Sequence, residues 1–211
     1  MIKKINNKKG GFTIIELMIS IALFIIVVMT GIGALLNASF IHHRAQSMRG
    51  IMDNLNFVME DMSRNLRTGY HYHCLATLDA LPILDGTVNT PLSCSDGQGI
   101  IFETSKGSTT DDTDQWAYYI SPAPNRKIYK STQGASDITK FIQISPDEVD
   151  IDTGSGFSVL GAEAPDSNGG GDNQQPLVLI RLSGKVIDQR GGNIPFSLET
   201  TVSQRLIDIA Q

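Results

Sequence analysis

The residues from Leu17 to Leu36 form an uncharged, strongly apolar run, and this run limits the fold more than any other feature of the sequence. A helix over this run is about 30 Å long at about 1.5 Å per residue, which matches the hydrocarbon thickness of a bilayer. A helix also satisfies its backbone polar groups within the segment, as a single span in lipid must. The sequence therefore predicts a transmembrane helix near the N-terminus.

The charges in front of this run predict the orientation of the helix. Four lysines lie among the first nine residues, which contain no acidic residue: Lys3, Lys4, Lys8 and Lys9. The positive-inside rule then keeps the N-terminus in the cytoplasm and exports the rest of the chain. A secretory signal peptide is the alternative, with Ala34 and Ala38 as small residues near its cleavage site, although the apolar run is longer than a usual signal-peptide core.

The remainder of the chain is acidic. The whole chain has 17 basic and 22 acidic residues and a formal net charge of −5. Without the four leading lysines, 13 basic residues stand against 22 acidic ones, so the remainder carries −9. A general nucleic-acid binder needs a basic surface. No nucleic-acid partner is therefore expected, although a local basic patch stays open.

Glu16 is an acidic residue at the edge of the apolar run, next to Ile15 and Leu17. A carboxylate within a membrane span is unfavourable by about 2.5–3.5 kcal/mol on insertion scales, so such a residue usually has a partner or a function. The alternative is that Glu16 lies at the lipid interface of a plain anchor.

The segment from Gly10 to Leu17 reads GGFTIIEL and resembles the type IV prepilin cleavage and methylation motif. The basic leader, the glycine, the aromatic residue, the glutamate and the apolar run occur in the order of that family. The resemblance implies that prepilin peptidase cleaves after Gly11 and that Phe12 becomes the N-methylated first residue. It also implies that Glu16 attracts the N-terminal amine of a neighbouring subunit during assembly.

Cleavage before Phe12 would also place a new cationic amine one helical turn from Glu16. Within a bundle of low dielectric constant, such a pair can set the register, because an unpaired buried charge is very costly.

The helix is expected to continue beyond the membrane. After Asn37 the sequence is amphipathic and contains no proline before Pro82. Apolar residues recur at helical spacings of three and four positions: Ile41, Ala45, Met48, Met52, Leu55, Met59, Met62 and Leu66. Because Gly69 is a typical helix stop, one helix is expected from Phe12 to Thr68. Its apolar stripe is expected to pack on the exported domain. A partner-binding face and an isolated coiled coil are the alternatives.

Short β-prone runs follow from Tyr70 onward. Strands are expected over Ile100–Phe102, Trp116–Ser121, Lys127–Ser131, Lys140–Ile144, Phe157–Leu160, Leu177–Ile187 and Phe196–Ile207. A hairpin is expected at Pro122–Asn125. Alternation at Ile142 and Ile144, and at Leu177 and Leu179, is consistent with strands that pack one face on the helix. The fold class is therefore α+β, with a long N-terminal helix packed on an antiparallel β-sheet, which is also the arrangement that the resemblance to pilins implies.

These patterns divide the chain into four parts. They are the leader peptide 1–11, the transmembrane segment 12–37, its amphipathic continuation 38–68 and the exported β-rich domain 69–211, in which residues 163–175 form a polar, glycine-rich loop.

Cys74 and Cys94 both follow the apolar run and share one compartment. Export to an oxidising compartment favours a disulfide between them. A zinc site with His71 and His73 is the alternative, although its spacing fits no standard pattern. Calcium is an alternative for two acidic clusters that lack an EF-hand pattern: Asp111, Asp112 and Asp114, and Asp166 and Asp172. Neither a metal nor a cofactor is expected.

The sequence contains no G-x-S-x-G, H-E-x-x-H, Walker A or dinucleotide-binding motif, so an enzyme is not expected. The resemblance implies a structural subunit, a minor pilin or pseudopilin, of a type IV pilus, a competence pilus or a type II secretion machine. The partners that it implies are prepilin peptidase, other pilin or pseudopilin subunits, an assembly platform membrane protein and the lipid bilayer. The alternatives are a membrane-anchored module that binds a surface, a substrate or DNA, and a conventional secreted protein.

Overall fold

The computed structural model describes residues 11–76, 90–163, 174–187 and 193–205. The chain forms two compact units, Met1–Met48 and Arg49–Gln211, which are taken separately below. Nearly all of the leader 1–11 and most of the loop expected over residues 163–175 lie outside the described residues.

One helix, α1 (Ile14–Thr68), runs through both units. It begins where the Thr13 hydroxyl accepts a hydrogen bond from the Glu16 backbone N–H at 3.3 Å, which is the bond of an N-cap residue. It ends at Gly69, whose N–H donates to the Asn65 carbonyl at 2.9 Å. A Cβ on Gly69 would overlap the Phe102 ring and lie 3.0 Å from the Glu103 carbonyl oxygen, so close packing requires glycine there. The expected continuous helix is confirmed, with its first residue at Ile14 instead of Phe12.

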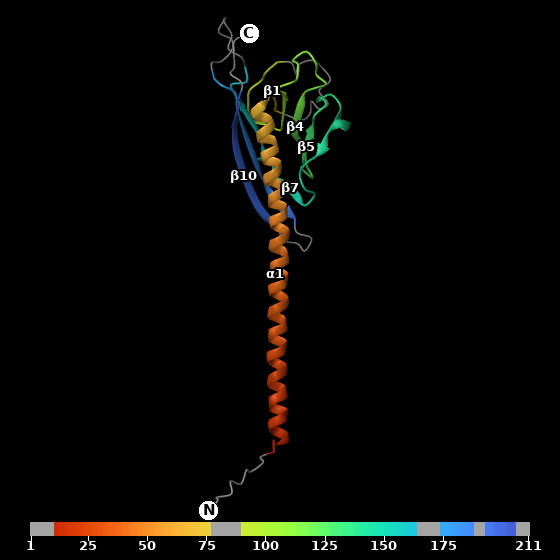
Figure 1. Cartoon of the computed structure of the whole chain (residues 1–211), viewed down its shortest axis with the longest axis vertical. Helices are drawn as coiled ribbons and strands as arrows, with labels where there is room; N and C mark the ends of the chain where they lie inside the picture. Colours follow the sequence, from red (N-terminus) through yellow and green to blue (C-terminus); the bar gives the residue numbers. More distant parts are fainter. Residues whose placement is uncertain (1–10, 77–89, 164–173, 188–192, 206–211) are drawn as a thin grey trace, which may run out of the picture. The chain divides into compact units, whose positions relative to one another are not determined.

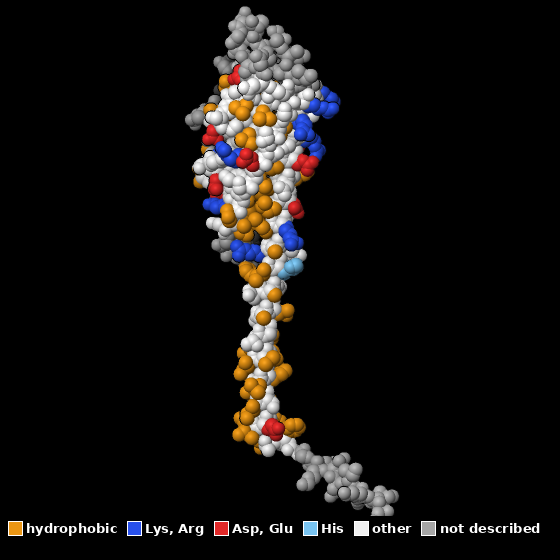
Figure 2. All heavy atoms as spheres, turned by 90° about the vertical axis from the view of Figure 1, so that its left-hand side faces the viewer, with side chains coloured by type: hydrophobic (Ala, Val, Ile, Leu, Met, Phe, Trp, Pro, Cys, Tyr) orange, Lys and Arg blue, Asp and Glu red, His pale blue; other side chains and the backbone are white. Residues whose placement is uncertain are grey.

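In the first unit, the large apolar side chains of the helix are exposed, and Figure 2 shows some of them along the face in view. Every described residue from Gly11 to Ser47 is exposed. This part of α1 is long and apolar enough to cross a membrane. A helix that is hydrophobic all round is unfavourable in water and needs lipid or other apolar helices around it.

The second unit contains two antiparallel sheets. The first has the order β1-β3-β4-β5-β6: β1 (Tyr70–Leu75), β3 (Gly99–Glu103), β4 (Trp116–Ile120), β5 (Ile128–Ser131) and β6 (Ile142–Gln143). The second has the order β10-β9-β8-β2, and β7 also pairs with β9: β2 (Cys94–Gly97), β7 (Val149–Ile151), β8 (Gly156–Leu160), β9 (Leu177–Ile187) and β10 (Asn193–Ser203). In Figure 1, β10 lies on one side of the last turns of α1, and β4 and β5 lie on the other.

The core of this unit contains the apolar stripe of α1. The buried helix residues are Leu55, Val58, Met59, Met62 and Leu66. Large buried side chains of the sheets include Ile100, Phe102, Tyr118, Ile128, Phe157 and Ile180. Burial of one such side chain contributes about 1.5–3 kcal/mol. The stripe predicted as a packing face is therefore confirmed from Leu55 to Leu66, whereas Ile41 and Ala45 are exposed.

Most expected strands are present, and the segment Pro122–Asn125 joins antiparallel β4 and β5 as expected. The expectation for Lys140–Ile144 is wrong in part. Ile138–Lys140 forms the short 3-10 helix η3, because the Asp137 side chain accepts a hydrogen bond from the Thr139 N–H and caps it. Only β6 remains of the strand, and Ile142 on it is 70% exposed.

The second sheet differs from expectation in which face of β9 is buried and in where β10 begins. In β9 the buried residues are Val178, Ile180, Leu182 and Val186, while Leu177 and Leu179 point to the outer face. β10 starts at Asn193, ahead of the expected Phe196, and pairs with β9 along its whole length up to Ser203. Pro195 lies within β10, as an edge strand permits. Residues 206–207 of the expected strand lie beyond the described part.

Three strands were not predicted: β1, β2 and β7. No strand was expected over Tyr70–Leu75, where His71 and His73 were alternative zinc ligands beside Cys74, but Tyr72 and Cys74 are buried core residues of β1. Its pattern is interrupted by a β-bulge between Tyr70 and His73, where His71 has a φ of 59°. β2 and β7 are too short to show alternation.

Candidate functional site

The predicted cleavage site lies in exposed, non-helical chain immediately before α1. Phe12 is 84% exposed, and Gly11 and Phe12 precede the first helical residue. No described atom outside the adjacent residues would lie within 4 Å of a Cβ placed on Gly11. The fold therefore does not require glycine at this position, so a requirement for it would have to come from an enzyme that reads the segment.

Glu16 is the third residue of the helix and follows the N-cap residue Thr13 by three positions. The pattern Thr-x-x-Glu is that of a capping box, and one of its two hydrogen bonds, from the Glu16 N–H to the Thr13 hydroxyl, is present. A negative charge in the first turn also interacts favourably with the helix dipole. Within the part of the chain that the structure describes, the Glu16 carboxylate has no ion-pair partner. The side chain therefore remains available for a cation that comes from outside the described chain.

Two other polar side chains of this segment, Ser20 and Thr30, bond to their own helix. The Ser20 hydroxyl donates to the Glu16 carbonyl at 2.8 Å, and the Thr30 hydroxyl donates to the Ile26 carbonyl at 3.0 Å. Such back-bonding satisfies a hydroxyl without water. Glu16 is thus the one ionisable residue within the apolar part of α1, from Ile14 to Ile41.

The two cysteines form the expected disulfide. Cys74 lies on β1 and Cys94 on β2, with their Cα atoms 5.9 Å apart, so the bond links the first sheet to the second. A Cβ on Gly97 would lie 2.8 Å from the Cys94 sulfur and 3.1 Å from the Leu75 carbonyl oxygen, so glycine makes room for the bond.

The alternative metal sites are not supported. The zinc alternative fails because both sulfurs are used in the disulfide, and His73 Nδ1 lies 2.7 Å from the Thr90 carbonyl oxygen. In the loop before β4, the Asp111 carboxylate binds the Thr113 N–H and hydroxyl, and the Asp114 carboxylate binds the Ser108 N–H. No group of three metal-ligating side chains converges among the residues that could be searched. Asp166 and Asp172 lie outside the described residues.

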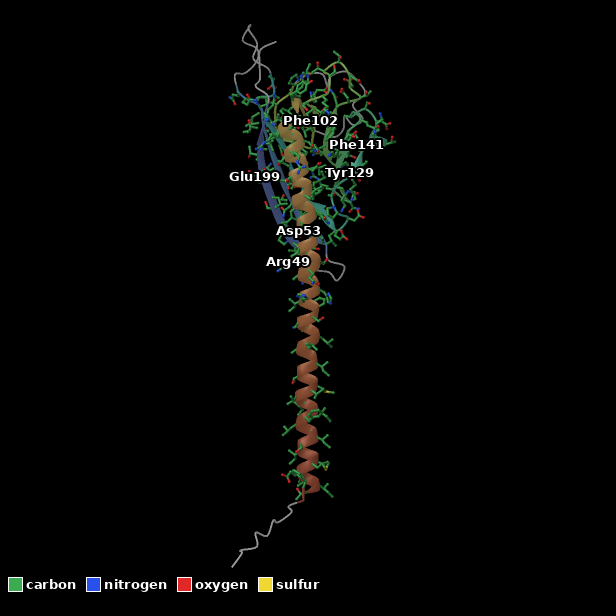
Figure 3. The ribbon with its side chains drawn as sticks, viewed as in Figure 1. Arg49, Asp53, Phe102, Tyr129, Phe141 and Glu199 are labelled. Atoms are coloured by element: carbon green, nitrogen blue, oxygen red, sulfur yellow. A yellow bond between two sulfur atoms is a disulfide. The ribbon has the colours of Figure 1, made fainter. Side chains whose placement is uncertain are left out.

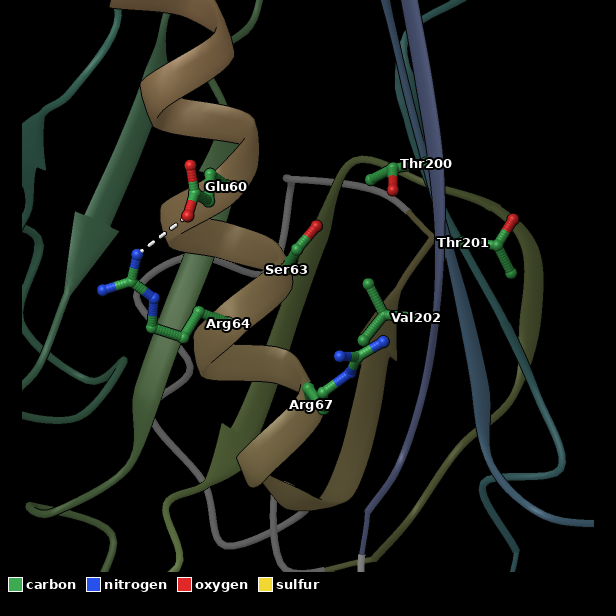
Figure 4. A pocket seen from close by; sticks show the side chains of 7 residues that line it. All are labelled: Glu60, Ser63, Arg64, Arg67, Thr200, Thr201 and Val202. Carbon is green, nitrogen blue, oxygen red and sulfur yellow. Dashed lines mark hydrogen bonds and ion pairs between the residues drawn. The ribbon is translucent and has the colours of Figure 1, made fainter.

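A shallow groove of about 280 Å³ lies between the last turns of α1 and the edge strand β10 (Figure 4). It is lined by Glu60, Ser63, Arg64, Arg67, Thr200, Thr201 and Val202. Glu60 and Arg64 pair with each other at 3.0 Å. The groove could not be predicted from the sequence, because its two walls, in α1 and β10, are far apart along the chain. Its lining combines charged side chains, hydroxyl groups and the apolar Val202.

The aromatic residues of the first sheet belong to its packing. Tyr119 stacks on Tyr129 with ring centroids 5.0 Å apart and meets Phe141 edge to face at 4.9 Å, in the region labelled in Figure 3. Offset and edge-to-face aromatic pairs contribute about 0.5–1.5 kcal/mol beyond area burial.

Comparison with protein-family models gives one match, the prokaryotic N-terminal methylation motif, over residues 6–32. This segment contains Gly11, Phe12 and Glu16 and the first half of the apolar run. Comparison with curated proteins and with solved structures gives no match. The chain thus carries the type IV prepilin-like signature at the start of a helix that is long and apolar enough to cross a membrane, ahead of two antiparallel sheets.

Proposed function

We propose that this chain is a minor pilin or pseudopilin, a structural subunit of a type IV pilus-like or type II secretion filament. Prepilin peptidase removes the leader after Gly11, and the mature chain assembles through α1. The observation that carries the proposal is the methylation motif at the start of a helix whose apolar surface is exposed on all sides. The chain serves assembly and is not an enzyme.

The proposed location follows from the same segment. The lysine-rich leader holds the N-terminus in the cytoplasm, and the domain from residue 69 onward lies in the periplasm or outside the cell. The Cys74–Cys94 disulfide supports this location, because disulfides persist in oxidising compartments. The partners are the prepilin peptidase, other pilin or pseudopilin subunits and an assembly platform membrane protein.

Glu16 provides the specificity of assembly. Between helices in lipid there is no hydrophobic driving force, because lipid tails are as apolar as leucine. Apolar side chains alone therefore do not fix the register of neighbouring subunits. The carboxylate of Glu16 can pair with the N-terminal amine of an adjacent mature subunit, and misregistered packing leaves both charges unpaired at a high cost.

This mechanism is tested by replacing Glu16 with glutamine, which keeps the shape of the side chain and removes its charge. We expect Glu16→Gln and Glu16→Ala to insert into the membrane normally and to be absent from sheared filaments or from co-purified subunit complexes. Asp53→Asn is the matched control, because Asp53 is an exposed acid on the same helix outside the apolar part. Incorporation of Glu16→Gln at the level of the control would overturn the role of the charge.

A further inference from the structure

Glu103, at the end of β3, is a completely buried carboxyl group. Its side chain has 0% exposure. Oε1 accepts a hydrogen bond from the buried Gln115 amide at 2.8 Å. Oε2 is also buried, and no described group donates to it. Gly107 packs so closely over Oε2 that a Cβ there would overlap it. A buried carboxylate oxygen without a hydrogen-bond donor is unfavourable, so this environment favours the protonated form of Glu103.

Asp114 has a second buried carboxylate oxygen without a hydrogen-bond donor among the described residues. Its Oδ2 accepts from the Ser108 N–H at 3.0 Å, whereas its Oδ1 is buried and has no donor among the described residues. Asp114 and Glu103 interact directly through their side chains. One proton between Glu103 Oε2 and Asp114 Oδ1 would give both oxygens a hydrogen-bond partner.

The charged side chains that act on Glu103 are both acidic, Asp112 and Asp114. Tyr70 of β1 lies opposite Glu103 in the sheet register, and its hydroxyl donates to the Gly107 carbonyl at 2.9 Å. Asp112 and Asp114 come from the loop, and Gln115 is neutral. Burial raises the pKa of Glu103 to about 7, and the negative charges of Asp114 and Asp112 contribute to this rise. The hydrogen bond from Gln115 acts in the opposite direction and lowers the pKa. No described cation is among the groups that shift the pKa of Glu103.

We propose that Glu103 and Asp114 share one proton, and that this proton holds the loop of residues 104–114 closed over the end of the first sheet. The protonated Glu103 Oε2 donates to Asp114 Oδ1. Loss of the proton to solvent leaves the buried Glu103 carboxylate next to the half-buried Asp114 carboxylate, and the two repel each other. The loop then opens so that water can solvate them.

The direction of the pH dependence follows from linkage. In the open loop the Glu103 carboxyl regains its ordinary pKa of 4.5, and in the closed loop its pKa is about 7. The closed loop therefore binds the proton more tightly, so opening becomes easier as pH rises. The equilibrium constant for opening rises about tenfold per pH unit between these two values and levels off above the higher one.

Amide hydrogen exchange of the purified full-length protein in detergent micelles tests the proposal. After correction for intrinsic exchange rates, we expect protection of residues 104–114 to fall at least about tenfold between pH 5.5 and pH 8. Protection of β9 should stay constant. The fluorescence of Trp116, the single tryptophan and the neighbour of Gln115, should change with a midpoint near neutral pH.

Two variants separate the shared proton from other causes. Glu103→Gln can donate from its amide to Asp114 at every pH, so its loop should stay closed and lose the pH dependence. Asp111→Asn is the matched control and should keep it, because the Asp111 carboxylate accepts from the Thr113 N–H and hydroxyl. Should Glu103→Gln fail to fold, Asp114→Asn replaces it. Asparagine donates to the Glu103 carboxylate and favours its ionised form, so the transition should move to lower pH.

Three results would overturn the proposal. The first is equal protection of the loop at both pH values in the unmodified protein. The second is an unchanged transition in Glu103→Gln or, where that variant does not fold, in Asp114→Asn. The third is closure of the loop at pH 8 by added calcium chloride and its reopening by EDTA, because a cation would then be the occupant between the two carboxylates.

Discussion

Asp61 connects the last turns of α1 to the first sheet. Its carboxylate accepts from Lys130 Nζ at 2.8 Å, from the Tyr118 hydroxyl at 3.1 Å and from the Asn65 amide at 3.1 Å. Lys130 also lies over the Trp116 ring, 4.7 Å from its centroid. Burial raises the pKa of Asp61, but the hydrogen bonds and the charge of Lys130 outweigh it, so the pKa lies below its usual value. The charged form of Asp61 therefore stabilises the folded domain.

Replacement of Asp61 by asparagine should lower the free energy of unfolding by about 1–3 kcal/mol, because Lys130 loses its charge partner while it remains mostly buried. Thermal unfolding of the full-length protein in micelles measures the change. Glu60→Gln is the control, because its pair with Arg64 is exposed and exposed pairs contribute about 0–1 kcal/mol. The Asp61 contribution is present above its ordinary pKa of 3.8 and should disappear as the pH falls below it. Equal melting temperatures for the two variants would contradict this role.

At the scale of the elements, the disulfide and the end of α1 hold the second unit together. The Cys74–Cys94 bond closes a separation of 20 residues and links β1 of the first sheet to β2 of the second. Gly69 lets the chain turn directly from the helix into β1 while Phe102 packs against it.

The double variant Cys74→Ser, Cys94→Ser should lose about 3 kcal/mol of stability, as the chain-entropy model gives for a loop of this size. A reducing agent should lower the melting temperature of the unmodified protein to that of the variant and leave the variant unchanged. A further decrease in the variant would show that the reductant acts elsewhere, and equal stability of the two proteins would show that the bond contributes nothing.

Gly69→Ala and Gly50→Ala should change stability in opposite directions. The added Cβ at Gly69 meets the Phe102 ring and the Glu103 carbonyl, and overpacking of this kind costs about 1–3 kcal/mol. The Cβ at Gly50 meets nothing within 4 Å inside α1, so alanine should stabilise by about 0.5–1 kcal/mol. Melting temperatures measured side by side check both signs. A stabilised Gly69→Ala variant would contradict the packing described here.

The features that the sequence predicted are those encoded by neighbouring residues. The stripe from Leu55 to Leu66 has a helical period, and Leu177–Ile187 is a β-prone run long enough to stand out, so both elements were predicted. β1 was missed because its bulge at His71 interrupts alternation. The phase of β9 was missed because apolar residues occur on both of its faces, and only packing decides which face is buried.

The residues of interest likewise include some that the sequence identifies and some that only the folded structure reveals. Gly11, Phe12 and Glu16 are contiguous in the sequence and could be identified without a structure. The buried carboxyl of Glu103 could not, because its environment is made by Asp114, Gln115 and Gly107 after folding. The groove beside β10 likewise depends on two segments that are distant along the chain.

In the molecule as a whole, the proposed processing step exposes the start of the apolar helix that precedes the β-rich domain. In the unprocessed chain a lysine-rich leader precedes Phe12, so the backbone nitrogen of Phe12 is part of a peptide bond and carries no charge. Cleavage after Gly11 would turn this nitrogen into a cationic amine four residues before Glu16. The proposed assembly therefore depends on where the mature chain begins.

Intact-mass spectrometry of the protein purified from its own membranes tests this claim most directly. The account predicts a mature chain that begins at Phe12, heavier by one methyl group, with the Cys74–Cys94 bond formed. Gly11→Val should retain the leader, while Gly50→Ala should be processed normally. A mature chain that begins at any other residue, or complete processing of Gly11→Val, would contradict the account.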